Sequence, residues 1–541
     1  PISEGGTISS RCIKVFAVLL ISTIALVAPL QTVGALQQKV RVIVGVNSRE
    51  IALHRGKLAE IGAIVGEIPE LGAVVLEIPI SAVIRIRGLP FVKYVEEDYV
   101  IEMIGKTSAP PGKSRPKISL VSYTSSVTVE PGGIGEVSFT LRNSGTADAT
   151  IIVELRNENS IAIAGKNLVV PAGASVTDNL TFTAPTTPGT YTWSLVVVDA
   201  IDRTTVYASG TVTVNVSSSS TQPSSSPDPT YTDTVGWNVK MINATQVWST
   251  SASHGDAAYG YHTVVQVAIV DTGIDYTHRD LSGAVVWCVV SLNATRVFYR
   301  GFDLANCADP HGHGTHVAGI VAARLNNWGI AGVAPKSVLY AIRVLDASGK
   351  GYASDIARGI VESVKGPDGL VGTEDDADVI SMSLGGASST VLYDAVRYAY
   401  SNGAVLVAAA GNSGGSSPVC PACYPEVIAV GAIDRYYAVP SWSNRNPDVV
   451  APGSGVLSTY PGNRHVIASG TSMACPHVSA AVALVQAVRL ATGRQKLAPA
   501  QMIELIRTTA IDLGTAGYDA LYGYGLIDAY RAVSESMTRF N

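Results

Sequence analysis

The stretch Gly470–His477 reads Gly-Thr-Ser-Met-Ala-Cys-Pro-His, and a long apolar, alanine-rich run from Val478 to Leu490 follows it. Such a run predicts a buried helix. A serine where this helix begins lies beside backbone N–H groups that lack a partner within the helix, and the helix dipole there favours negative charge. Both effects would stabilise an oxyanion that forms next to Ser472. The same residues also fit a simpler role, in which Thr471 or Ser472 only caps the helix.

Two further segments carry residue types that can act together with this serine. The apolar β-run Val264–Asp275 contains the carboxylate of Asp271, and the segment His311–Gly319 reads His-Gly-His-Gly-Thr-His-Val-Ala-Gly and opens a second helix of small residues. A serine hydroxyl is a weak nucleophile unless a neutral imidazole accepts its proton, and a carboxylate can orient that imidazole. Asp, His and Ser therefore occur in one of the known chain orders of a catalytic triad.

A fourth segment, Leu406–Gly414, is an apolar strand that leads to an asparagine. The four motifs together resemble those of the subtilisin-like serine proteases, the subtilases, over roughly residue 233 to the C-terminus. The resemblance implies a secreted serine endopeptidase that cleaves polypeptide substrates through an acyl-enzyme. The family's catalytic histidine begins the sequence His-Gly-Thr-His, which here is His313, so His316 and His311 are expected to be structural and loop residues. The implied catalytic residues are Ser472 as nucleophile, His313 as general base, Asp271 as its orienting carboxylate and Asn412 as oxyanion donor.

The resemblance also implies how substrate binds. Two segments should hold the substrate backbone as edge strands, and glycines there allow close backbone approach. With the alanine-rich wall before Asn412, the primary pocket looks roomy and apolar, which predicts a preference for large apolar or aromatic side chains at the position before the cut. The implied substrate-binding residues are Gly349, Lys350, Gly351, Ser383, Leu384, Gly385, Ala410 and Gly411.

Calcium is the cofactor that the resemblance implies. The implied ligands of a strong site, through side chains or backbone carbonyls, are Asp233, Asp280, Arg324, Asn326, Trp328 and Ile330. Taken alone, Asn326-Asn327 would be an ordinary turn. The acidic loop Gly366–Asp378 is a possible second metal site or only a solvated turn, and its candidate ligands are Asp368, Glu374, Asp375 and Asp376.

The N-terminal part of the chain predicts a precursor. Basic residues precede an apolar run that ends in small residues, so residues 1–35 are expected to be a secretory signal peptide, with a retained membrane anchor as the alternative. Alternating strand and helix patterns in residues 36–105 fit a β-α-β-β-α-β ferredoxin-like unit. Its end, Val92–Ile104, resembles the end of the subtilase inhibitory propeptide, which implies a processed bond between Ile104 and Gly105. The alternative is an independent small domain.

Two linkers frame a further domain. Residues 106–117 are Pro-rich, and residues 217–231 are rich in Ser and Pro, as in extended linkers. Between them, residues 118–216 contain short alternating runs separated by turn signals, which predicts an immunoglobulin-like β-sandwich. Residues 232–541 should form the catalytic domain, an α/β fold with a parallel sheet and helices on both faces.

Charge and cysteines limit the partners. The formal net charge of −5 argues against a nucleic-acid surface. In an oxidising compartment Cys288 could pair with Cys307 and Cys420 with Cys423. A redox or zinc role of the Cys-Pro-Ala-Cys sequence is the alternative.

We expect a monomer that is secreted or associated with the cell surface and is inhibited by its own propeptide. We expect no membrane span once the signal is removed. The competing class is an inactive relative that only binds other molecules through its sandwich.

Overall fold

The computed structural model describes residues 39–104, 117–129, 131–145, 149–158, 162–171, 173–185, 187–199, 206–216, 235–252, 265–326 and 328–540. The predicted signal peptide and Ser/Pro-rich linker lie outside the described residues, as do Gly105 and Asp233. The chain divides into two compact units, Pro1–Asp98 and Tyr99–Asn541. The division falls a few residues before the expected end of the propeptide, because Val100–Met103 pairs with strands of the second unit.

The first unit contains a four-stranded sheet in the order β2-β3-β1-β4. Helix α3 follows β1, and α4 follows β3, which is the element order of a β-α-β-β-α-β unit. Strand β2 carries no clear period-two pattern, since most of its residues are partly exposed and Gly66 marks a register shift. The bounds are β1 Lys39–Gly45, α3 Ile51–Ala59, β2 Ala63–Ile68, β3 Ala73–Pro79, α4 Ala82–Arg87 and β4 Tyr94–Glu97.

A β-sandwich follows within the second unit. Its sheets have the orders β10-β9-β12-β13-β7 and β11-β8-β6. Alternate residues of β8 are buried, and Phe139 from this strand shares a core with Trp193 from the other sheet. The bounds are β6 Ile118–Tyr123, β7 Ser126–Val129, β8 Ile134–Asn143, β9 Ala149–Arg156, β10 Ala162–Val170, β11 Ser175–Thr183, β12 Gly189–Asp199 and β13 Val206–Val216.

The C-terminal part is built on an eight-stranded sheet in the order β16-β15-β17-β14-β19-β21-β22-β23. All neighbouring pairs are parallel except β15 and β16. The central strands are buried along their whole length, as expected when both faces of a parallel sheet are covered. The strand bounds are β14 Gln266–Asp271, β15 Val285–Leu292, β16 Val297–Gly301, β17 Val338–Arg343, β19 Val379–Met382, β21 Val405–Ala409, β22 Val427–Ile433 and β23 Val449–Pro452.

Helices cover this sheet and bring the candidate residues to it. Helices α7 and α10 contact each other, and α8 and α9 form a second contacting pair. In the described part of the chain α10 is the one helix long and apolar enough to cross a membrane, but most of it is buried, so it is a core helix. The bounds are α5 Trp237–Met241, α6 Ala244–Ala252, α7 His313–Ala322, α8 Ala353–Ser363, α9 Thr390–Ser401, α10 Thr471–Ala491, α11 Pro499–Thr509 and α12 Ala529–Arg539.

Candidate active site

Three buried side chains from three elements make up the candidate triad. Asp271 ends β14, His313 begins α7 and Ser472 lies in the first turn of α10. The Nδ1 atom of His313 lies 2.8 Å and 3.0 Å from the two carboxylate oxygens of Asp271. The Asp271 carboxylate also accepts the backbone N–H of Thr272, at 2.7 Å. A neutral His313 that donates from Nδ1 keeps its lone pair on Nε2, as a general base requires.

The environment separates His313 from its neighbour His316, although both are buried. Burial alone lowers the pKa of His313, but the charge and hydrogen bond of Asp271, with the more distant charge of Asp309, raise this pKa above its ordinary value. Burial lowers the pKa of His316 to about 3, and its Nε2 lies 3.0 Å from the carbonyl oxygen of Val466. Among the residues that the structure describes, no carboxylate bonds to His316, which is therefore a neutral structural residue.

Ser472 is held against the neighbouring strand end in this structure. Its Oγ donates to the carbonyl oxygen of Ser383 at 3.0 Å, and the Oγ of Ser383 donates to the carbonyl oxygen of Ser472 at 2.8 Å. The Nε2 of His313 is buried and has no hydrogen-bond partner among the described residues. The proton-accepting nitrogen therefore has no competing partner among these residues, and Ser472 Oγ is bonded to Ser383 instead of to it.

Asn412 is oriented by the start of α10. Its Oδ1 accepts the backbone N–H of Thr471 at 2.9 Å and lies 3.0 Å from the Thr471 hydroxyl oxygen. Because Oδ1 is held in this way, Nδ2 is left as the donor that can face a developing oxyanion. The loop after Asn412 is fixed by Asn444, whose Oδ1 accepts the backbone N–H groups of Ser413 and Gly415. Sequence reasoning missed Asn444, which lies in an irregular segment without a motif.

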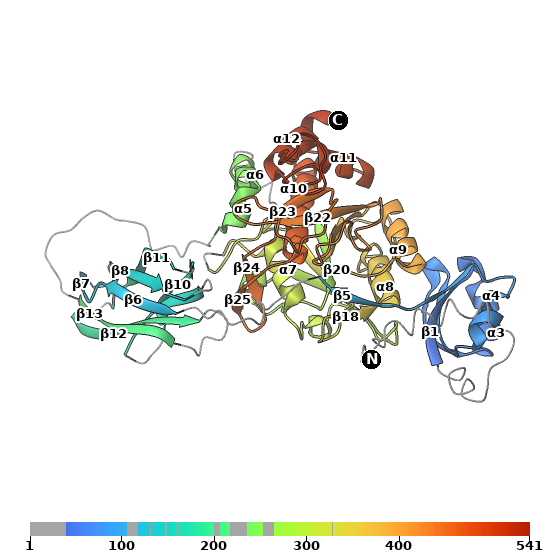
Figure 1. Cartoon of the computed structure of the whole chain (residues 1–541), viewed down its shortest axis with the longest axis horizontal. Coiled ribbons are helices and arrows are strands. Elements are labelled where there is room, and N and C mark those ends of the chain that lie inside the picture. The colour runs from blue at the N-terminus through green and yellow to red at the C-terminus, as the bar shows by residue number, and fades with distance from the viewer. Residues whose placement is uncertain are drawn as a thin grey trace, which may run out of the picture. The chain divides into compact units, whose positions relative to one another are not determined.

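A short strand of the chain itself lies in the predicted substrate groove. Strand β5, Val100–Met103, is antiparallel to both β18, Lys350–Tyr352, and β20, Leu384–Gly385 (Figure 1). The backbone N–H of Met103 donates to Gly349 O at 2.9 Å, and that of Ile104 donates to Ser383 O at 3.0 Å. The carbonyl of Ser383 thus accepts hydrogen bonds from Ile104 and from Ser472, which places residue 104 beside the candidate nucleophile.

Ile104 and Ile101 are the buried side chains of this segment. A Cβ atom at Gly385 would collide with the side chains of Ile104 and Val419, so glycine is required for this close approach. The backbone N–H of Val419 donates to Ala410 O at 3.0 Å, which ties Val419 to the predicted pocket wall. Sequence reasoning did not single out Val419, because it precedes Cys420 in a loop and not in a recognisable motif.

The expected calcium loop surrounds Asp280, which is fully buried. The Asn326 Nδ2 atom lies 3.3 Å from Asp280 Oδ1, and the backbone N–H of Ile330 donates to Asp280 Oδ2 at 2.9 Å. The guanidinium group of Arg324 instead donates to the carbonyl oxygens of Pro335, Ser337 and Gly283. Only the backbone of Arg324 remains for a ligand role, and its N–H donates to the carbonyl oxygen of Asp280 at 2.7 Å.

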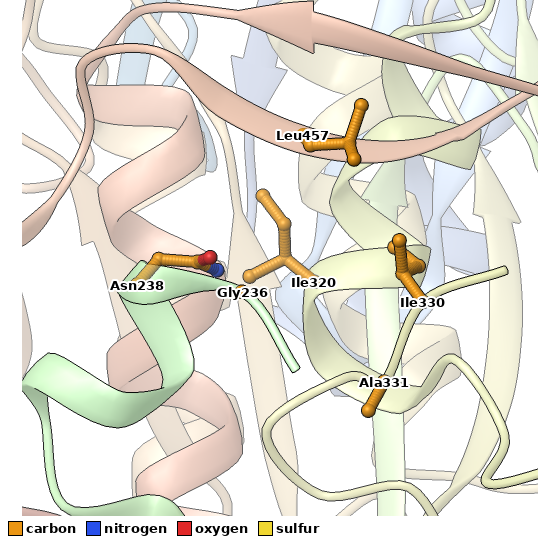
Figure 2. A pocket seen from close by; sticks show the side chains of 6 residues that line it. All are labelled: Gly236, Asn238, Ile320, Ile330, Ala331 and Leu457. Carbon is orange, nitrogen blue, oxygen red and sulfur yellow. The ribbon is translucent and has the colours of Figure 1, made fainter. Parts of the chain in front are cut away.

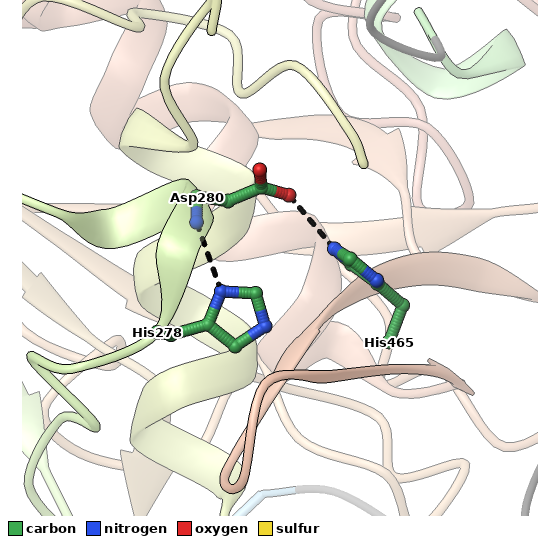
Figure 3. A group of neighbouring side chains, drawn as sticks. All are labelled: His278, Asp280 and His465. Carbon is green, nitrogen blue, oxygen red and sulfur yellow. Dashed lines mark hydrogen bonds and ion pairs between the residues drawn. The ribbon is translucent and has the colours of Figure 1, made fainter. Parts of the chain in front are cut away.

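Two histidines lie beside the same carboxylate (Figure 3). The described part of the chain contains one group of three side chains of the kinds that bind metals whose ligand atoms all lie within 4.8 Å of one another. Its members are His278, Asp280 and His465. The Nε2 of His465 is 2.7 Å from Asp280 Oδ2. Both ring nitrogens of His278 are engaged, since Nδ1 accepts the Asp280 N–H and Nε2 lies 2.9 Å from Arg464 O. His278 therefore holds the loop in place and is not available as a metal ligand.

The carboxylates of the acidic loop bond to the loop itself. Asp375 accepts the backbone N–H of Asp368, and Asp376 accepts those of Gly372 and Thr373. Glu374 contributes a carbonyl oxygen to the side chain of Gln266. Hydrogen bonds within the loop thus engage the carboxylates of Asp368, Asp375 and Asp376, three of the four residues expected to bind a second metal.

Both expected cysteine pairs are brought together. Disulfides join Cys288 to Cys307, with Cα atoms 5.9 Å apart, and Cys420 to Cys423, with Cα atoms 4.6 Å apart. Cys475 is free and buried, and burial raises the pKa of its thiol to about 11.

A small pocket elsewhere contains none of the candidate catalytic residues (Figure 2). It is lined by Gly236, Asn238, Ile320, Ile330, Ala331 and Leu457.

Comparison with known proteins agrees with this geometry. The subtilase family pattern matches residues 262–525. The chain is 41% identical over 316 residues to a thermophilic serine proteinase of Bacillus sp. strain AK1, a match that covers 57% of this chain and 66% of that protein. It is 37% identical over 300 residues to the minor extracellular protease Epr of Bacillus subtilis, covering 55% of this chain and 41% of Epr.

A third relative is covered almost completely. Over 307 residues the chain is 41% identical to subtilisin DY of Bacillus licheniformis. This match covers 55% of this chain and 98% of subtilisin DY. The match to that protein runs nearly from end to end, and the folded core that it covers carries Asp, His and Ser in the family order. The chain therefore belongs to the subtilase family, the subtilisin-like serine endopeptidases.

Proposed function

We propose that this chain is an extracellular zymogen whose endopeptidase uses Ser472, His313, Asp271 and Asn412, and whose own segment Val100–Ile104 occupies the substrate groove. The observation that carries this proposal is the position of Ser383. Its carbonyl accepts hydrogen bonds from Ser472 Oγ and from the Ile104 backbone N–H, so the nucleophile and a bound peptide strand meet at one atom.

In the proposed reaction His313 first accepts the proton of Ser472 and later passes it to the leaving group. Ser472 Oγ attacks the carbonyl carbon of the residue in the primary pocket while His313 Nε2 accepts its proton. Asp271 stabilises the resulting imidazolium through Nδ1, which is the same interaction that raises the pKa of His313. His313 then donates the proton to the leaving amine, and a water molecule hydrolyses the acyl-enzyme by the reverse sequence.

The negative charge that develops on the carbonyl oxygen has two sources of stabilisation. Asn412 Nδ2 is left as a donor by the bonds that hold its Oδ1 to Thr471. The start of α10 adds to it, because the positive end of the helix dipole lies at Ser472 in the first turn. Such donors act most strongly where water is excluded, and Ser472 is fully buried in this structure.

Ile104 supports the proposed preference for apolar residues before the cut. Its side chain is 8% exposed and shares the space over Gly385 with Val419. A segment whose last residue fills this pocket resembles a product that has not yet left, as expected of an inhibitory propeptide. The proposed processed bond joins Ile104 to Gly105.

Secretion is proposed on two grounds. The name of the relative Epr describes it as extracellular. The two disulfides are typical of oxidising compartments outside the cytosol. Both agree with the signal peptide predicted for residues 1–35.

Calcium is proposed as a structural cofactor. Asp280 offers a buried carboxylate, a hard oxygen donor of the kind calcium takes, and the Asn326 side chain and the backbone of Ile330 lie against it through their N–H groups. Side-chain oxygens of Asp280 and Asn326, backbone carbonyls of Arg324, Trp328 and Ile330, and Asp233 would hold the ion. Bound calcium would cross-link these segments, while catalysis stays with the triad.

A fluorophosphonate probe tests the proposed function directly, because it reacts only with an activated serine. Wild type should be labelled once the propeptide segment is displaced, and Ser472→Ala should not be. His313→Ala should abolish labelling, whereas the matched change His316→Ala should leave a labelled enzyme if that variant folds. Labelling that persists in Ser472→Ala would refute the assignment of the nucleophile.

A further inference from the structure

The side chain of Lys350 makes an ion pair with the strand that lies in the groove. Its Nζ lies 2.8 Å from Oε1 of Glu102. Lys350 and Glu102 are also direct partners in the register of β18 and β5. Counted back from Ile104, Glu102 is the third residue before the proposed cut, and it lies between the more buried Ile101 and Met103. The pair is therefore a contact between the groove and one defined substrate position.

The backbone around Lys350 is built before substrate arrives. Asp346 Oδ1 accepts the hydroxyl of Ser348 at 2.6 Å and the backbone N–H groups of Ser348 and Lys350 at 2.8 and 3.1 Å. The Asp346 N–H in turn donates to Lys350 O at 2.8 Å, and Gly349 closes the turn with a φ of +74°. The Asp346 carboxylate is thus engaged by the turn, and the Lys350 ammonium group is directed to a different carboxylate.

The register of the groove does not depend on the substrate sequence. The bonds that align β5 run through backbone atoms, namely Met103 N–H to Gly349 O and Ile104 N–H to Ser383 O. Any extended peptide that makes the same bonds places its third residue before the cut opposite Lys350. Only the side chain at that position then decides whether Lys350 has a partner.

We propose that Lys350 is a specificity residue that favours an acidic side chain at the third position before the cleaved bond. The inference rests on the proposed function of β5 as a substrate-like strand and extends it to substrates in trans. The side chains of Lys350 and Glu102 are about half exposed, at 49% and 52%. Exposed ion pairs are weak, so the preference for Glu over Gln should be about two- to fivefold and should weaken with salt.

The test uses peptide p-nitroanilides of the form acetyl-Ile-X-Met-Ile, with Glu, Gln or Lys at X. Ratios of kcat/KM between these substrates are measured at low ionic strength for mature wild type, Lys350→Gln and Lys350→Glu. Wild type should rank Glu above Gln above Lys. Lys350→Gln should flatten the ranking, and Lys350→Glu should reverse it. Because each ratio is formed within one variant, differences in folding or active fraction cancel.

A matched variant and a salt series complete the design. Lys240→Gln removes the same charge from the exposed face of α5, away from the groove strands, and should keep the wild-type ranking. Raising NaCl to about 1 M should bring the wild-type Glu-to-Gln ratio toward one. Equal cleavage of all three peptides by wild type, or a ranking unchanged in Lys350→Glu, overturns the inference and leaves the protease assignment intact. Failure to cleave any of the peptides overturns the groove register as well.

Discussion

At the scale of single residues, the contrast between His313 and His316 shows how partners and not burial decide a histidine's role. Both rings are buried on the first turn of α7, yet the pKa of one is raised and that of the other is lowered to about 3. The difference is the carboxylate of Asp271, which lies against only one of them. The sequence motif identified His313 through family resemblance, and the hydrogen bonds provide the physical reason.

The raised pKa of His313 has a measurable consequence. Catalysis needs the neutral imidazole, and a raised pKa keeps it protonated to a higher pH, so the acid limb of kcat/KM should have its midpoint above 6.5. Asp271→Asn removes the charge that favours the protonated form and should move this midpoint to lower pH, besides lowering kcat about 10⁴-fold. A pH profile of peptide hydrolysis for both proteins measures the shift. An acid limb at the same pH in Asp271→Asn would contradict the assignment.

Asn412 and Thr471 allow a second test at this scale. Asn412→Ala removes the proposed oxyanion donor and should lower kcat about 10²- to 10³-fold with little change in KM. Thr471→Val removes the hydroxyl that lies next to Asn412 Oδ1 and accepts the Gly411 N–H, but it keeps the backbone N–H bond to Asn412, so its effect on kcat should be much smaller. Steady-state kinetics on one peptide compare the two variants. Equal losses, or a loss confined to KM, would argue against an oxyanion role of Asn412.

At the scale of elements, long periodic segments were predictable from sequence and short or irregular ones were not. The buried run before Asp271 and the small-residue helix at Ser472 appear as β14 and α10 because their patterns repeat over many residues. Strand β20 has only two residues and is defined by the strand that it pairs with. The positions of Val419 and Asn444 likewise depend on tertiary contacts, which leave no local signal.

The loop around Asp280 leads to a prediction for an element. If calcium binds the native loop and not the unfolded chain, its removal should destabilise the protein by mass action. In the Ser472→Ala background, which prevents autolysis, excess chelator should lower the melting temperature by roughly 5–10 °C, as expected for a loss of about 2–3 kcal/mol in a domain of this size. Calorimetry measures the shift.

The control for the calcium prediction is the loop carboxylate itself. Asp280→Ala should start from a lower melting temperature and should respond little to chelator, because the proposed ligand is already gone. Asp375→Ala, in the acidic loop whose carboxylates bond to the loop, should keep most of the wild-type response. If chelator does not change the melting temperature of the protein that keeps Asp280, a stabilising calcium site at Asp280 is ruled out.

At the scale of the whole molecule, the boundary between the two compact units suggests the order of maturation. Residues up to Asp98 form the first unit, whereas Tyr99 onward belongs with the sandwich and the protease. Strand β5 belongs to the second unit because it is held by hydrogen bonds to β18 and β20. The segment proposed to be cut thus remains bound in the groove of the protease, next to the nucleophile.

Maturation should therefore begin at this segment. The wild-type precursor, refolded and followed by N-terminal sequencing, should yield a new terminus at or within a few residues of Gly105, and Ser472→Ala should stay uncut. The physical reason is proximity, since the backbone bond from Ile104 N–H to Ser383 O holds residue 104 beside Ser472. Replacing Ile104 by Asp puts a charge into the apolar space beside Val419 and should slow the cut, while Ile104→Leu should preserve it. A sole new terminus within residues 217–230, or processing that persists without Ser472, would show that the groove strand is not the first site of cleavage.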